Sequence, residues 1–213
     1  KKVLGEALRG DVDLIIGTHR LLSDDVVVPF LGLLIVDEEH RFGVKHKESL
    51  RALKKGVDVL SLSATPIPRT LQQSLLGIRD ISRIETPPIT RKPIKTFVEF
   101  FSWKRSVEII KEEVLRGGQV YFLHNHVQSI DYYTEKLRGL FPRERVEHIH
   151  GQQESRGLEK NLLDFFSGEI SILVCSTIIE SGLDVANANC IIINNPQNLG
   201  LSQLYQIRGR VGR

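Results

Sequence analysis

Short apolar runs recur through the second half of the chain, and each is separated from the next by a segment long enough to hold a helix. Residues 154–167 show helical spacing most clearly, because apolar side chains recur there at i, i+4, i+7 and i+8. These side chains are Leu158, Leu162, Phe165 and Phe166. Strands separated by helices pair in parallel, which predicts an α/β fold. The predicted strands of this half are residues 96–101, 120–124, 146–150, 170–175 and 190–193.

The first half of the chain shows the same alternation. The run Leu33–Val36 contains no polar residue and predicts a strand buried on both faces, as in a parallel sheet. Residues 57–62 alternate apolar and polar side chains and predict another strand. We expect further strands over residues 13–20 and 81–84, and helices over residues 1–10, over 103–117 and from residue 129 onward.

A proline-rich segment divides the two halves. Residues 85–95 contain three prolines and three basic residues with little apolar periodicity. Such a composition favours extended backbone and predicts an interdomain linker over residues 86–95. We therefore expect one domain over residues 1–85 and a second over residues 96–213.

The composition is that of a soluble globular protein, with 41% hydrophobic and 26% charged residues. No apolar run approaches the length of about 18 residues that a transmembrane helix needs, so we expect no membrane partner. The two cysteines, Cys175 and Cys190, lie in apolar runs and predict buried free thiols in a reducing cytoplasm. A net charge of +3 permits a polyanionic partner without requiring one.

An acidic group follows the run 33–36 directly, as Asp37, Glu38, Glu39 and His40. Ligands of open α/β sheets bind at the carboxyl ends of the strands. One carboxylate there can hold a hydrated Mg²⁺, while its neighbour orients or deprotonates a water molecule. The alternative is an acidic turn that only faces solvent, and the residues alone leave both interpretations open.

Gly17, Thr18, His19 and Arg20 end the predicted strand over residues 13–20. A glycine followed by a hydroxyl and two basic side chains suits a close approach to a phosphate backbone. An ordinary turn capped by Thr18 is the alternative.

The C-terminal stretch 203–213 contains Arg208, Arg210 and Arg213, spaced by small residues. Guanidinium groups bind phosphate oxygens in pairs, and the glycines between them allow the backbone to approach closely. A generic Arg-Gly segment that binds RNA is the alternative, although such segments are usually repetitive and this stretch occurs once.

Taken in order, these segments resemble the motifs of superfamily 2 helicases and translocases. The matching segments are residues 17–20 for motif Ib, 37–40 for motif II, 63–65 for motif III, 177–185 for motif V and 206–213 for motif VI. The resemblance implies two RecA-like parallel-sheet domains in tandem. We expect the first domain to be truncated, because no Gly-x-x-x-x-Gly-Lys-Ser/Thr phosphate loop occurs in the 213 residues. We expect the second to be truncated as well, because the translocation motif that follows the arginine motif in this family does not occur.

A narrower resemblance connects the chain to the bacterial transcription-repair coupling factors (Mfd) and to the RecG fork-remodelling helicases. It rests on residues 37–44, 65–70 and 204–210. Residues 77–82, together with 86–88 and 95–98, are more similar to the coupling factors.

The resemblance implies roles for single residues. Asp37 would hold Mg²⁺ through water, Glu38 would activate the water that attacks ATP, and Arg210 and Arg213 would act as arginine fingers. The implied ATP-binding residues are Glu39, His40, Gly182, Asp184 and Gln206. Ser63, Ala64 and Thr65 would couple the ATP cleft to the nucleic acid, and the implied DNA contacts are Thr18, His19, Arg20, Ser176 and Thr177. Each of these lesser positions could instead be a turn or cap residue.

The implied function is that of an ATP-dependent translocase on double-stranded DNA, with ATP and Mg²⁺ as cofactors. A coupling factor uses this motor to displace stalled RNA polymerase for nucleotide excision repair, so RNA polymerase and the excision-repair protein UvrA would be partners through other domains. A RecG-like helicase is one alternative, and a nucleic-acid-binding module without ATPase activity is another. Without a phosphate loop, we expect the isolated chain to be inactive as an ATPase.

Overall fold

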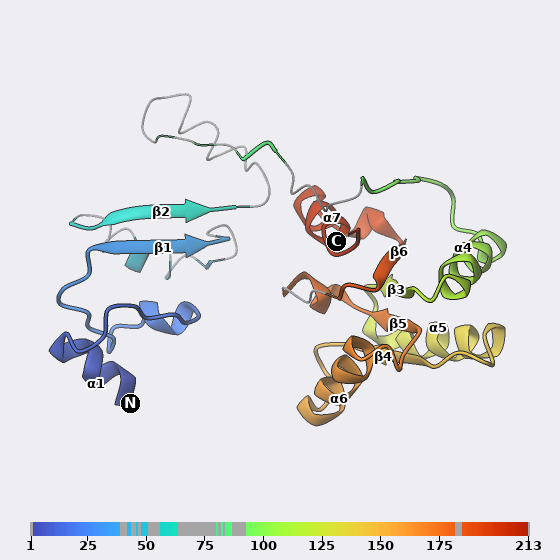
Figure 1. Ribbon diagram of the computed structural model, residues 1–213, viewed down its shortest axis with the longest axis horizontal. Helices are drawn as coiled ribbons and strands as arrows, with labels where there is room; N and C mark the ends of the chain where they lie inside the picture. Colours follow the sequence, from blue (N-terminus) through green and yellow to red (C-terminus); the bar gives the residue numbers. More distant parts are fainter. Residues whose placement is uncertain are drawn as a thin grey trace. The chain divides into compact units, whose positions relative to one another are not determined.

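The computed structural model describes the chain except for residues 1, 39–41, 44, 45, 47, 51–55, 64–79, 81, 83, 87–92, 182–184 and 213. The chain divides into two compact units, Lys1–Ser82 and Arg83–Arg213, and each is described by itself. Figure 1 shows a helix and a pair of strands in the first unit, and a sheet with helices on both faces in the second.

Unit 1 contains helix α1 (Lys2–Arg9), the 3-10 helix η1 (His19–Leu22) and strands β1 (Leu33–Asp37) and β2 (Asp58–Leu62). The two strands are parallel neighbours, with Leu33 opposite Asp58 and Asp37 opposite Leu62. This confirms both predicted strands and their parallel arrangement.

The expectation that β1 is buried on both faces is wrong for this chain. Leu33 and Ile35 are each 54% exposed, whereas Val36 is buried. Side chains alternate across a sheet, so Leu33 and Ile35 share one face with Leu60 and Leu62 of β2, which are also exposed. The apolar composition of β1 is that of an inner strand, but none of the described residues of unit 1 covers this face.

Two predicted strands are absent from the described residues. Residues 13–17 are irregular and lead into η1, with Leu14 and Ile16 mostly exposed. Residues 96–101 are also irregular, with Val98 and Phe100 almost fully exposed. A strand is stable only where a neighbour satisfies its backbone groups, and neither segment pairs with another described segment. The predicted strand 81–84 falls partly outside the described residues, and its described positions, Ser82 and Ile84, are not in a strand.

Unit 2 is built on a four-stranded parallel sheet in the order β4-β5-β3-β6. Its strands are β3 (Gln119–His124), β4 (Val146–Ile149), β5 (Ile172–Cys175) and β6 (Ala188–Asn194). Its helices are α4 (Trp103–Leu115), α5 (Val127–Leu140), α6 (Ser155–Phe166) and α7 (Leu201–Arg208), with 3-10 turns η3 (Thr177–Ser181) and η4 (Pro196–Asn198). The strand and helix alternation predicted from residue 103 onward is confirmed, although helix α7 was not among the predicted helices.

The helices cover both faces of the unit 2 sheet. On one face, Val120 and Phe122 of β3 pack with residues of α4 and α5 such as Ile110 and Leu137. On the other face, Tyr121 and Leu123 of β3 pack with residues of α6, η3 and α7. Successive residues of a strand point to opposite faces, which explains why this strand has no polar alternation.

Both cysteines are free thiols, as predicted, but only Cys175 is buried and Cys190 is partly exposed. Burial raises the pKa of both thiols, that of Cys190 to about 12, so both stay protonated and unreactive near neutral pH. Among the described residues no helix has the length and apolar character that crossing a bilayer requires.

Core packing on α4 gives a first prediction. Ile110 is fully buried, so Ile110→Ala should lower the free energy of unfolding of unit 2 by about 2–5 kcal/mol. Leu115 lies on the same helix but is 86% exposed, so Leu115→Ala should change the free energy of unfolding by less than about 0.5 kcal/mol. Chemical denaturation followed by the fluorescence of Trp103, the single tryptophan, measures both values. Equal losses in the two variants would contradict the packing described here.

Candidate functional site

The acidic group predicted at the end of β1 lies at the carboxyl edge of the unit 1 sheet. Asp37 is the last residue of β1, and the backbone N–H of Glu38 donates a hydrogen bond of 3.0 Å to the carbonyl of Leu62 on β2. Ser63 follows β2 directly. The parallel register therefore brings Asp37, Glu38 and Ser63 to one edge, although 24 residues lie between Glu38 and Ser63 in the sequence.

Glu38 has a left-handed backbone, with φ of +50°. This conformation is unfavourable for a residue with a side chain, and it recurs at functional sites where the surrounding structure imposes it. It turns the chain sharply at the end of β1, and the side-chain Oε2 of Glu38 is buried. Asp37, one residue earlier, is exposed. The two carboxylates therefore occupy different environments.

Asp37 suits a hydrated magnesium ion. Mg²⁺ prefers carboxylate oxygens, retains several waters and needs only one or two protein ligands. An exposed carboxylate at a strand end offers such a ligand together with room for the waters. Glu39, His40, Ala64 and Thr65, which were also predicted for this site, lie outside the described residues.

The predicted phosphate-binding segment of unit 1 forms a capped turn. The Thr18 hydroxyl accepts a hydrogen bond of 3.4 Å from the backbone N–H of Arg20, at the start of η1. The Arg20 guanidinium donates to both carboxylate oxygens of Asp25, at 2.6 and 2.5 Å, and this pairing lowers the pKa of the Asp25 carboxyl. The ring of His19 faces that of His46, with centroids 5.0 Å apart. Contact of this segment with DNA stays a prediction, and it would require Arg20 to exchange Asp25 for a phosphate.

In unit 2, two predicted segments lie against each other. Ser176 follows β5 and is buried, and Thr177 begins η3. Helix α7 packs on η3 through an apolar contact that includes Ile179 and Ile207. The fold therefore brings Thr177 and the arginine stretch, distant in sequence, to neighbouring elements. Gly182, Asp184 and Arg213 lie outside the described residues.

Arg210 lies on the turn that follows α7. Its backbone N–H donates a 3.0 Å hydrogen bond to the carbonyl of Ile207, and the next residue, Val211, is buried in the core. Gln206, one helical turn earlier, is 9% exposed, and the Nε of Arg210 is buried. The core thus holds Gln206 and Val211 on either side of Arg210, which argues against a generic Arg-Gly segment.

A histidine and asparagine cluster at the carboxyl edge of unit 2 was missed by the sequence analysis. His124 ends β3, and its Nδ1 lies 3.0 Å from the Nδ2 of Asn194, which ends β6. The Nε2 of His124 lies 2.7 Å from the hydroxyl of Ser129 on α5. His126 makes a further contact of 3.2 Å with Asn198. The rule applied to Asp37, that polar residues after an apolar strand mark a site, would have found this cluster.

The hydrogen bonds of His124 define its tautomer. The Asn194 amide nitrogen can only donate, so Nδ1 of His124 accepts and Nε2 carries the proton that is donated to Ser129. Burial lowers the pKa of His124, and the neighbouring His126 lowers it further. The ring is therefore neutral at physiological pH.

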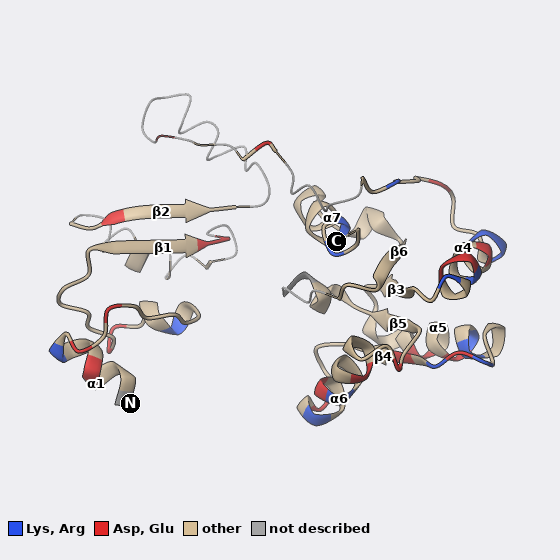
Figure 2. Cartoon of the chain, in the orientation of Figure 1, with Lys and Arg blue, Asp and Glu red and all other residues tan. Residues whose placement is uncertain are grey.

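The two edges differ in charge. Figure 2 shows the acidic end of β1, whereas β3, β5 and β6 carry no charged side chain and the charges of unit 2 lie mainly on α4, α5 and α6. Among the described residues, the unit 1 edge offers carboxylates that suit a cation. The unit 2 edge offers neutral hydrogen-bonding groups, namely the side chains of His124, Ser176 and Asn194.

Comparison with known proteins decides the family. Residues 104–213 match the helicase conserved C-terminal domain, and residues 1–74 match the DEAD/DEAH box helicase family. The chain belongs to the helicase family. Its two units therefore correspond to helicase-type RecA-like domains, as the sequence resemblance implied.

The chain is also similar to transcription-repair-coupling factors along its length. It is 50% identical over 212 residues to that of Escherichia coli, covering 100% of this chain and 18% of the relative. It is 53% identical over 213 residues to that of Haemophilus influenzae, covering 100% of this chain and 19% of the relative. This helicase chain thus spans less than a fifth of the length of these relatives.

Solved structures agree with the fold. The structure of RecG bound to a three-way DNA junction matches with a TM-score of 0.70 and 37% identity, covering 100% of this chain and 28% of that one. The Mycobacterium smegmatis helicase Lhr bound to single-stranded DNA and AMP-PNP matches with a TM-score of 0.57 and 20% identity, covering 84% of this chain and 27% of that one. The second match shows the fold alone.

The lowered pKa of His124 predicts a loss of stability in mild acid. The unfolded chain takes up a proton near the ordinary histidine pKa of 6.5, whereas the buried ring does so only at lower pH. Stability is therefore full above about pH 6.5 and falls as the pH drops below it. His124→Gln, which keeps a polar group but does not titrate, should flatten the fall of the unfolding midpoint between about pH 7 and 5.5. An unchanged slope in the variant would contradict this assignment.

Proposed function

We propose that this chain is part of the motor of an ATP-driven translocase on double-stranded DNA, of the transcription-repair coupling type. The supporting observation is the 50–53% identity to coupling factors over all or nearly all of the chain, with the predicted Asp37 and Glu38 at a strand end. The larger protein would use ATP hydrolysis to move on DNA and displace stalled RNA polymerase for nucleotide excision repair. RNA polymerase and UvrA would be bound by its other domains, in the cytoplasm.

ATP and Mg²⁺ would bind at the carboxyl edge of unit 1. Asp37 would hold the ion through water, and the ion would neutralise charge on the phosphates of ATP. Glu38 would orient and deprotonate the attacking water, and its partly buried, conformationally fixed position suits a group that must be aimed. Glu39, His40, Gly182, Asp184 and Gln206 would complete the nucleotide site.

Arg210 and Arg213 would supply positive charge to the transition state from unit 2. Ser63, Ala64 and Thr65 would couple the nucleotide to the DNA, which Thr18, His19, Arg20, Ser176 and Thr177 would contact through its backbone. Because phosphate contacts carry little base information, binding should be independent of sequence.

A RecG-like fork-remodelling helicase is the second candidate, supported by the 37% identity to the junction-bound RecG structure. The identity to coupling factors is higher over the same residues. Displacement of a stalled RNA polymerase by the larger protein would favour the first candidate. Regression of a model fork without such displacement would favour the second.

Glu38 gives the sharpest test. In the larger protein, Glu38→Gln should abolish DNA-stimulated ATP hydrolysis while DNA binding persists, because the amide cannot deprotonate water but preserves the shape of the side chain. Phosphate release and DNA-binding assays on the same preparation measure both. The isolated chain, whose sequence contains no phosphate loop, should show negligible turnover.

Asp58→Asn is the matched control for Glu38→Gln. Asp58 is an exposed acidic residue at the amino end of β2. Asp58→Asn therefore removes one negative charge, as Glu38→Gln does, but at the opposite edge of the β1–β2 sheet. Turnover should persist in this variant. Full turnover in Glu38→Gln, or equal losses in both variants, would exclude the proposed role of Glu38.

Arg210 gives an independent test. In the larger protein, Arg210→Ala should reduce the rate of ATP hydrolysis by roughly 10³–10⁵-fold, the range known for arginine fingers, with a smaller effect on ATP binding. Lys111→Ala, which removes an exposed positive charge from α4, should leave the rate near that of the parent. A loss of ATP affinity with an unchanged maximal rate would instead assign Arg210 to ground-state binding.

A further inference from the structure

Strand β4 forms one edge of the unit 2 sheet, with β5 on its inner side. The carbonyls of Arg145 and Ile149 accept hydrogen bonds from Ser171 at 3.0 Å and from Ser176 at 3.3 Å, on the β5 side. Backbone groups of alternate residues face opposite sides of a strand. The groups of Val146, His148 and His150 therefore face outward, where an exposed strand edge is open to pairing with another chain.

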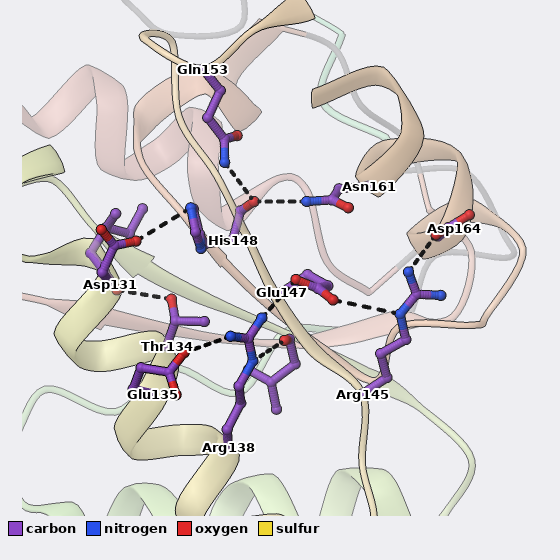
Figure 3. A network of polar contacts seen from close by, with 12 residues as sticks. Asp131, Thr134, Glu135, Arg138, Arg145, Glu147, His148, Gln153, Asn161 and Asp164 are labelled. Carbon is purple, nitrogen blue, oxygen red and sulfur yellow. Dashed lines mark hydrogen bonds and ion pairs between the residues drawn. The ribbon is translucent and has the colours of Figure 1, made fainter. Parts of the chain in front are cut away.

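Side chains from three elements occupy this outer edge (Figure 3). Arg138 of α5 donates from Nε to the carbonyl of Val146 at 2.9 Å. Asn161 of α6 donates to the carbonyl of His148 at 3.1 Å, and Gln153 donates to the same carbonyl at 3.3 Å. Both outward carbonyls of β4 are thus already hydrogen-bonded.

Gln153 reproduces the contacts of a neighbouring strand. Its Nε2 donates to the carbonyl of His148, and its Oε1 accepts a 3.2 Å hydrogen bond from the backbone N–H of His150. A residue on a parallel strand opposite Ile149 would satisfy the same two groups, one with its N–H and the other with its C=O. One carboxamide therefore replaces both hydrogen bonds of the missing neighbour.

Ion pairs hold the capping helices at this edge. Arg138 pairs with Glu135 on α5 at 2.6 Å and with Glu147 on β4 at 2.7 Å. Arg145 pairs with Asp164 on α6 at 2.5 Å. Arg145 also pairs with Glu147 at 3.7 Å, so these ion pairs join β4 to α5 and α6, the helices that carry the caps Arg138 and Asn161.

We propose that these side chains close the β4 edge, and that their closure prevents unit 2 from pairing edge to edge with a second copy of this chain. A second copy presents the same strand, and two copies related by a twofold axis would align their β4 strands antiparallel. Such a pair would satisfy the outward groups of Val146, His148 and His150 in both copies. The caps satisfy the carbonyls of Val146 and His148 and the N–H of His150 within one chain, and so weaken the driving force for that pairing.

The test uses the full chain with both amides removed, Gln153→Ala combined with Asn161→Ala. Sedimentation velocity over a wide range of concentrations should show concentration-dependent dimers for this variant and monomers for the parent. Gln128→Ala, which removes an exposed glutamine from α5, is the matched control and should behave as the parent does. If the double alanine variant does not fold, Gln153→Met with Asn161→Leu keeps the side-chain size while removing the hydrogen bonds.

Amide hydrogen exchange locates the contact. At low concentration, the double variant lacks the Gln153 cap on the His150 N–H. Exchange of the His150 amide should therefore be about tenfold faster than in the parent, a change in rate that corresponds to the free energy of one hydrogen bond. At high concentration, pairing should restore protection of the His150 amide in the variant and should add protection of the His148 amide. A folded variant that stays monomeric, or that associates without protecting these amides, would overturn the proposal.

Discussion

The structure of unit 2 depends on the burial of strand β3. All six of its residues, Gln119–His124, are buried, and it pairs with β5 on one side and β6 on the other. Its side chains alternate between two apolar layers, one formed with α4 and α5 and the other with α6, η3 and α7. Gln119, at its start, donates two hydrogen bonds of 2.7 Å to the carbonyls of Phe165 and Ile170 and so ties the strand to the α6–β5 connection.

The position of the candidate site follows from this arrangement. Parallel strands end at a common edge, so the buried register of β3 brings His124, Ser176 and Asn194 to the same end of the sheet. In unit 1 the same principle brings Glu38 beside Ser63. The carboxyl edges of the two sheets differ in chemistry because different residues end their strands. Carboxylates end β1, whereas imidazole, hydroxyl and amide groups end the strands of unit 2.

Edges and faces without a neighbour explain where the structure departs from the sequence patterns. Segments 13–17 and 96–101 have the composition of strands, but they are irregular because no described segment pairs with them. Leu33, Ile35, Leu60 and Leu62 have the composition of an inner sheet face and are nonetheless exposed. Strand β4 differs from these segments because it pairs with β5 on its inner side, while Arg138, Gln153 and Asn161 donate hydrogen bonds to its outward carbonyls.

The sequence by itself determined the α/β class, most strands of unit 2, the helices between them, and the family through its ordered motifs. These properties depend on local composition, since apolar runs and helical spacing are read within one segment. It predicted the acidic end of β1 for the same reason. Only the tertiary structure decided which strands find a partner, that Glu38 is held in a left-handed conformation, and that His124 joins Asn194 across 70 residues. Those features depend on contacts between segments distant in sequence, which no single segment encodes.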